Sequence, residues 1–101
     1  MYRASTPTHR FRIPIAPENI AKILLTYTQN DQIVLEKTEA DLTNEGHVWS
    51  LTLTQEETNL FASDYAQVQV RYLGTDGRSF PSRKFRLFVG AVSNDEVMTS
   101  E

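Results

Sequence analysis

The side chains with the clearest potential for chemistry are two histidines and two nearby carboxylates. His47 follows Asp41 and Glu45 in a polar stretch, whereas His9 stands apart in a segment rich in threonine and proline. A metal site needs several such ligands held together by fixed elements, and carboxylates on loops are usually just solvated. The chain also has no cysteine, so it offers neither a thiolate ligand nor a disulfide. We therefore expect no metal site.

Motifs for catalysis are also missing from the sequence. No glycine-rich loop leads into a helix long enough to hold a phosphate group. No serine stands in the strand–turn–helix context of an activated nucleophile. The sequence thus predicts that the protein is not an enzyme and that it needs no cofactor.

Charged side chains are segregated along the chain, which makes a charged binding surface worth considering. Residues 31–64 carry eight acidic side chains and one lysine, whereas the segments on either side of them are basic. Five of the cations alternate with apolar residues, so they should point away from the core. If the first strand lies beside the last, these cations share one face with an outward phenylalanine, and that face would bind an acidic partner protein. The predicted protein-binding residues are Arg10, Arg12, Arg71, Lys84, Arg86 and Phe88.

Two other classes of partner fit the sequence poorly. The formal net charge is −3, whereas domains that bind nucleic acid are usually strongly basic. The longest apolar runs are only a few residues, far short of a membrane-spanning segment. The start of the chain also lacks the apolar core of a secretory signal, so we expect synthesis in a cytoplasm. We therefore expect neither nucleic acid nor a membrane as a partner.

Alternation of apolar and polar residues predicts the strands that position these side chains. Turn residues at 30–31 and 74–77 separate neighbouring runs, and residues 38–46 read as a loop with at most a short edge strand. Thr54 and Glu57 form the sequence pattern of a helix capping box, which predicts one short helix at a corner between strands. The expected strands span residues 10–15, 20–29, 32–37, 47–53, 65–73 and 78–89.

Short strands at regular spacing around one corner helix predict an all-β fold, a single antiparallel β-sandwich of the immunoglobulin-like kind. The segment from Tyr65 to Ser82 resembles the last two strands of fibronectin type III domains. We expect Trp49 near the centre of the core. The other residues expected in the core are Phe11, Ile13, Leu25, Tyr27, Leu51, Val68, Val70 and Phe85. The expected division is an N-terminal arm at 1–9, the sandwich at 10–92 and a polar tail at 93–101.

An ordered set of short motifs also resembles small proteins encoded by tailed phages and prophages of Gram-positive bacteria. This resemblance implies a virion protein, made in the host cytoplasm and located in the particle, but it carries no functional residues. The expected partners are other phage structural proteins or further copies of the chain. The motifs lie at Thr6–Thr8, Phe11–Pro14, Ile23–Gln29, Val34–Lys37, Leu53–Phe61 and Val68–Arg71.

Two main functions follow from the sequence and this resemblance. The first is a non-enzymatic structural or accessory protein of the phage particle, in the capsid, tail or baseplate, that acts through protein–protein contacts. The alternative is a small phage-encoded inhibitor that binds a bacterial defence protein through the acidic region 31–64. A carbohydrate-binding module is a third reading, but the spacing of Trp49 with Leu51 and Leu53 places its only strong aromatic in the core.

Overall fold

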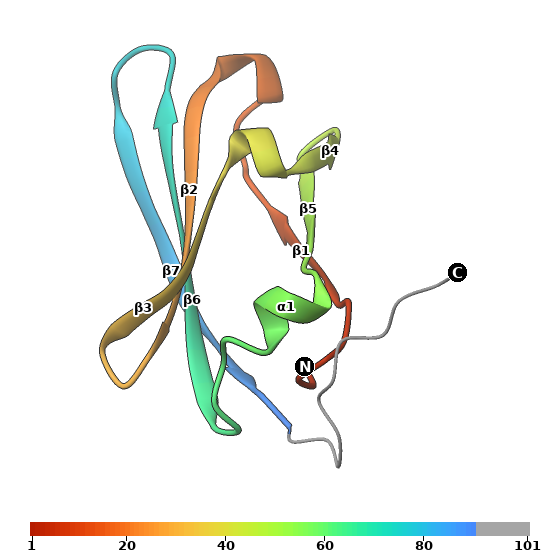
Figure 1. The fold of residues 1–101 in the computed structure, drawn as a ribbon. Coiled ribbons are helices and arrows are strands. Elements are labelled where there is room, and N and C mark those ends of the chain that lie inside the picture. The colour runs from red at the N-terminus through yellow and green to blue at the C-terminus, as the bar shows by residue number, and fades with distance from the viewer. Residues whose placement is uncertain (91–101) are drawn as a thin grey trace.

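Two antiparallel sheets face each other across an apolar core (Figure 1). The computed structural model describes residues 1–90, and the expected tail at 93–101 lies outside them. One sheet has the strand order β1-β5-β4 and the other the order β3-β2-β6-β7. The strands are β1 (Thr8–Arg12), β2 (Ile20–Gln29), β3 (Gln32–Thr38), β4 (Thr43–Glu45), β5 (Val48–Thr52), β6 (Tyr65–Gly74) and β7 (Ser79–Phe88).

Within residues 1–90, three short helical segments connect the strands. They are the 3-10 turns η1 (Pro17–Asn19) and η2 (Glu39–Asp41) and the α-helix α1 (Gln55–Thr58). Both halves of the predicted capping box are present, because Thr54 accepts a hydrogen bond from the N–H of Glu57 and Glu57 accepts one from the N–H of Thr54. The predicted all-β, immunoglobulin-like antiparallel sandwich with one short helix is confirmed.

Two tight turns set the register of the long strands. Asn30 and Asp31 join β2 to β3, and their φ angles of 50° and 62° are those of a two-residue hairpin turn. Asparagine and aspartate tolerate this left-handed region better than most residues, which explains their place there. Gly77, with a φ of 86°, serves the same purpose between β6 and β7.

The core lies between the inner faces of the two sheets. Trp49 is 8% exposed and Tyr27 is fully buried, as expected from the sequence. The expected burial of Phe85 is wrong, because its side chain is 49% exposed, and Phe11 is half-buried. The other residues that the sequence predicted in the core, Ile13, Leu25, Leu51, Val68 and Val70, are buried.

Polar contacts close the sandwich along β3, where η2 and α1 fill the gap between the sheets (Figure 1). Lys37 on β3 forms an ion pair with Glu57 on α1. The side chain of Gln29 bonds both backbone groups of Ala62, donating to the carbonyl at 2.9 Å and accepting from the N–H at 2.8 Å. Glu39 on η2 accepts a hydrogen bond from the N–H of Ile23 at 3.1 Å. We call this side of the molecule the closed edge.

Residues 1–7 lie against the sandwich. Tyr2 forms a parallel bridge with Gly90, and the N–H of Arg3 donates to the Gly90 carbonyl at 3.1 Å. The N–H of Ser5 donates to the buried hydroxyl of Thr58 at 3.1 Å. The structure therefore joins the expected arm at 1–9 to the domain. Within residues 1–90, no helix is both long enough and apolar enough to cross a membrane.

Candidate binding groove

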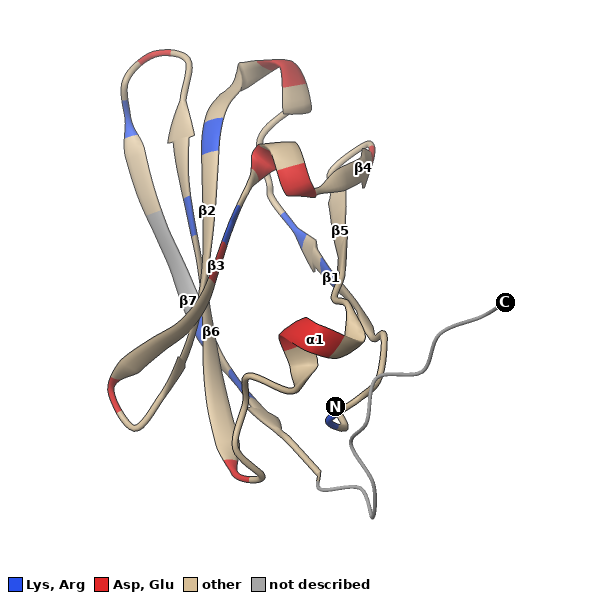
Figure 2. Ribbon diagram, in the orientation of Figure 1, with Lys and Arg blue, Asp and Glu red and all other residues tan. Residues whose placement is uncertain are grey.

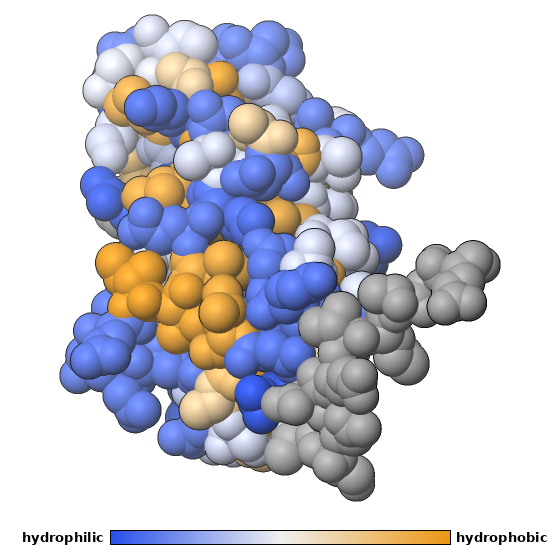
Figure 3. All heavy atoms as spheres, viewed as in Figure 1, coloured by the Kyte–Doolittle hydropathy of each residue, from blue (hydrophilic) through white to orange (hydrophobic). Residues whose placement is uncertain are grey.

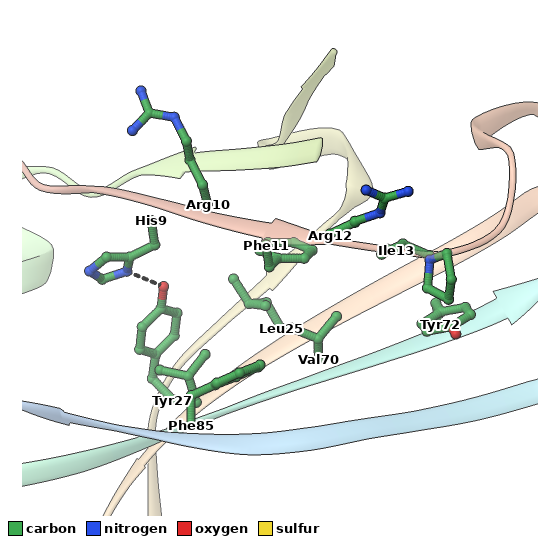
Figure 4. A pocket seen from close by; sticks show the side chains of 12 residues that line it. His9, Arg10, Phe11, Arg12, Ile13, Leu25, Tyr27, Val70, Tyr72 and Phe85 are labelled. Carbon is green, nitrogen blue, oxygen red and sulfur yellow. Dashed lines mark hydrogen bonds between the residues drawn. The ribbon is translucent and has the colours of Figure 1, made fainter. Parts of the chain in front are cut away.

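An apolar groove of about 370 Å³ lies between β1 and the facing sheet (Figure 4). Phe11 reaches into it from β1, and Phe85 reaches into it from β7 on the opposite side. Leu25 and Val70, from β2 and β6, lie between these two rings. The groove is thus a part of the interior that remains accessible from one side of the sandwich. Its other lining residues include His9, Ile13, Tyr27, Val68 and Tyr72.

The unequal width of the two sheets explains why this side is open. The sheet that contains β1 has three strands, whereas the sheet that ends in β7 has four. Phe85 pairs with Val68, whose side chain is buried, so Phe85 also points to the inner face of its sheet. No described strand of the narrower sheet lies beyond β1 to cover it. Alternation in the sequence correctly predicted that Phe85 points to the inner face of its sheet. It could not predict that the side chain there remains half-exposed.

One end of the groove carries a neutral polar pair. Nδ1 of His9 and the hydroxyl oxygen of Tyr27 share a hydrogen bond of 2.6 Å (Figure 4). Burial lowers the pKa of His9, and the nearby positive N-terminus lowers it further. Burial also raises the pKa of the Tyr27 hydroxyl, with a smaller contribution from Glu57. Both groups are therefore uncharged at neutral pH, so the pair offers hydrogen bonds but no charge.

The backbone of β1 has a free edge beside the groove. The N–H of Ile13 donates to the His47 carbonyl at 3.0 Å, and the N–H of Leu53 donates to the Pro7 carbonyl at 3.0 Å. In an antiparallel pair such bonds involve every second residue, so the backbone groups between them point to the other side of the strand. In β1 the outward set belongs to Thr8, Arg10 and Arg12, and no described strand pairs with it.

The predicted cations do not form one face. β1 pairs with β5 instead of the last strand, so Arg10 and Arg12 lie on the narrower sheet. Arg71, Lys84 and Arg86 lie on the wider one, and Figure 2 shows the cations divided between the two sheets. The expectation of a single shared face is wrong because it depended on a strand neighbour that alternation along the chain cannot identify.

A second aromatic site lies on the outer face of the wider sheet. Phe88, which the sequence placed outward, is 55% exposed, and its ring packs edge-on against Tyr65 with centroids 5.3 Å apart. The Arg86 guanidinium carbon lies 4.2 Å from the centroid of the Tyr65 ring. The structure thus brings two predicted residues, Arg86 and Phe88, together around Tyr65.

The histidines and carboxylates considered as metal ligands lie apart. Nδ1 of His47 lies 3.0 Å from two backbone carbonyls, those of Ile13 and Ile15, and must donate its proton there. Asp41 accepts a hydrogen bond from the N–H of Thr38 at the start of η2. Within residues 1–90, no three His, Cys, Asp or Glu side chains gather in a group that could hold a metal ion.

Comparison with known proteins supports the fold. The chain is similar to the crystal structure of CopC from Methylosinus trichosporium OB3b, with a TM-score of 0.58 and 16% sequence identity. The match covers 92% of this chain and 85% of CopC. No protein-family model and no curated protein matches the chain.

This comparison corrects the function expected from the sequence. The matching structure is CopC, which is not a phage structural protein, so the expected role in a virion is wrong. The same finding corrects the alternative function, a small phage-encoded inhibitor that binds through the acidic region 31–64. The resemblance to a phage family stays a prediction.

Proposed function

We propose that the chain is a non-catalytic binding module, whose ligand places an apolar part in the groove between β1 and β7. The observation that carries this proposal is the accessibility of Phe85. A half-exposed phenylalanine on the inner face of a sheet loses the stabilisation that full burial would give. Pockets that bind ligands are typically concave and mostly apolar, with a few polar groups that fix orientation, and the groove has this character.

The polar pair gives such a ligand a defined orientation. His9 and Tyr27 lie at one end of the groove, and the apolar rings of Phe11 and Phe85 face each other beyond them. A ligand with an apolar body and one neutral hydrogen-bonding group would match this arrangement. Because both members of the pair are uncharged at neutral pH, they favour a neutral group at that end over an ion.

Metal handling is a second candidate, toward which the likeness to CopC points. The described residues do not favour it. His9 lies on β1, whereas His47 lies in the turn between β4 and β5. Each uses Nδ1 in a hydrogen bond within the domain. A metal site needs further ligands at fixed positions near such a histidine, and none of the described carboxylates gathers there. The groove therefore carries the proposal.

A titration with indole, as a small neutral aromatic probe, tests the proposal. We expect methyl NMR signals of Leu25, Val68 and Val70 to shift, because these side chains line the groove. Phe85→Asp should abolish the shifts by placing a charge in the groove. Phe88→Asp is the matched control, because Phe88 lies on the same strand with a similar exposure but on the opposite face. Shifts around Tyr65 that only Phe88→Asp removes would overturn the proposal and favour the outer face.

A further inference from the structure

We propose that the groove takes an extended peptide, which pairs with the free edge of β1 as a fourth strand and alternates apolar with acidic residues. This inference rests on the proposed function, because it names the class of ligand that the groove would hold. Addition of a peptide strand to an exposed sheet edge is a general mode of recognition, in which backbone bonds provide affinity and side-chain pockets provide specificity.

The first argument is geometric. A fourth strand beside β1 would make the narrower sheet as wide as the facing one. Its inward side chains would lie over the groove, beside Phe11 and opposite Phe85. Side chains of a strand alternate between its two faces, so every second residue of the peptide would enter the groove. Those residues should be apolar, because the groove walls are apolar.

The second argument comes from the backbone of β1. The N–H and C=O groups of Thr8, Arg10 and Arg12 point away from β5, and no described strand pairs with them. Such a row of unpaired groups is a template for another chain. An added strand would satisfy it with antiparallel or parallel bonds, without any change to the β1–β5 pairing.

The third argument is charge. Arg10 and Arg12 are exposed on the outer face of β1, and neither forms an ion pair with any described residue. The outward residues of an added strand would lie directly beside them. Opposite charges in such cross-strand positions stabilise pairing, whereas like charges destabilise it. Lys84 and Arg86 flank Phe85 on β7 but point to the outer face of the wider sheet, so the charge beside the added strand comes from Arg10 and Arg12. The outward residues of the peptide should therefore be acidic.

The same charges argue against a second copy of this chain as the occupant. Pairing of two β1 edges would place the arginines of one copy beside those of the other, and pairing of β1 with β7 would place Arg10 and Arg12 beside Lys84 and Arg86. Either arrangement brings like charges together. Edge cations of this kind protect a strand from self-association while leaving it open to an acidic partner.

Binding of a designed peptide tests this inference. The probe is a peptide of about seven residues that alternates valine with glutamate and has blocked ends. A peptide with lysine in place of glutamate is the matched control, since it has the same apolar residues. We expect the glutamate peptide to bind the full chain and the lysine peptide to bind at least about tenfold more weakly. Bound peptide should also protect the amides of Arg10 and Arg12 from hydrogen exchange.

Two substitutions at one position separate backbone pairing from charge. Arg10→Gln removes the charge but keeps the N–H, and it should weaken binding of the glutamate peptide about 2- to 5-fold. Arg10→Pro also removes the outward N–H, which β1–β5 pairing does not use, and it should weaken binding by a further tenfold or so. A circular dichroism spectrum and thermal melt of each variant check that the fold is kept.

Each result bears on one of the two proposals. Equal binding by the Gln and Pro variants, or binding without amide protection, would overturn strand addition. Indole binding in the groove without any peptide binding would overturn the peptide and leave the proposed function standing. If the chain bound neither indole nor the glutamate peptide, both the proposed function and the peptide inference would be overturned. Self-association that the Pro variant abolishes would show a second copy at this edge and would overturn the acidic partner.

Discussion

The two long sides of the sandwich differ in whether the edge of the core is covered. At the closed edge, η2 and α1 cover the core, and side chains such as Glu57 and Gln29 satisfy the polar groups there. At the open edge, formed by β1 and β7, apolar rings remain accessible and the backbone of β1 has no described partner. The comparison teaches that one core can have a side whose contacts stabilise the fold and another side that remains open to a ligand.

The largest expected difference in stability between the two edges comes from truncating one phenylalanine at each of them. Phe61, at the closed edge, is 1% exposed and packs against Tyr27 with ring centroids 5.7 Å apart. Phe61→Ala should lower the free energy of unfolding by about 3–5 kcal/mol, because it leaves a cavity. Phe85→Ala, at the open edge, should cost about 1 kcal/mol, since the ring is already half in water. Urea denaturation of both variants measures the difference, and equal losses would remove the distinction between the edges.

A smaller loss of stability is expected when a buried hydroxyl group of the closed edge is removed. The Thr58 hydroxyl accepts a hydrogen bond from the Ser5 N–H at 3.1 Å and lies 3.0 Å from the carbonyl oxygens of Ser5 and Gln55. Thr58→Val keeps the shape but leaves that N–H without its acceptor, which should cost about 1–3 kcal/mol. Exchange of the Ser5 amide should also become faster. Thr43→Val, at an exposed position on β4, is the control and should be nearly neutral.

The ion pair of the closed edge should show its effect through pH. Burial would raise the pKa of Glu57, but the Lys37 ammonium and the hydrogen bonds from Thr54 outweigh it and hold the pKa below the usual 4.5. A carboxylate with a lowered pKa stabilises the fold above its usual pKa and loses this effect as pH falls through its folded value. Lys37→Met should therefore cost about 1 kcal/mol at neutral pH.

Acid titration of this variant checks the cause. Without Lys37, the pKa of Glu57 should rise, so the difference in stability between wild type and variant should shrink as the medium is made acidic. Lys84→Met provides the control, because Lys84 is exposed and forms no ion pair with any described residue. A constant difference at every pH would show that the ion pair does not stabilise this edge.

The smallest expected effect belongs to the histidine of the open edge. Because the pKa of His9 lies below its ordinary 6.5 in the folded chain, the unfolded chain takes up the proton first as pH falls. Acidification from about pH 7.5 to 5.5 should therefore lower stability, and His9→Gln should remove that part of the loss. Thermal melts of both proteins across this range measure it. If His9→Gln showed the same pH profile as the wild type, burial of His9 would not explain the loss.

Local patterns in the sequence were enough to predict the elements but not their neighbours. The turn at Asn30 and Asp31 and the capping box of Thr54 and Glu57 depend on residues close in the chain, and the structure confirms both. The strand parity of Phe85 was also correct. Whether another strand covers an inward side chain depends on sheet order, which alternation does not encode. For that reason the sequence missed the groove and misplaced Arg10 and Arg12 relative to Lys84.

A different apolar area shows where the closed edge is incomplete. Figure 3 shows apolar side chains gathered around β3 on the face that it views. Ile33 on this strand is 60% exposed, whereas the neighbouring Val34 and Leu35 are half-buried. β3 is also an edge strand of its sheet. Isolated surface apolar residues are common in folded proteins, and the described structure gives this area no cationic rim like that of β1.

The position of Trp49 gives the molecule an internal optical reporter. It is the sole tryptophan, it is buried, and it pairs across the strands with Phe11, one wall of the groove. Its indole nitrogen has no hydrogen-bond partner among the described residues. A buried indole emits at shorter wavelengths than one in water. Its emission should therefore register both unfolding of the domain and occupation of the groove beside Phe11, without any attached label.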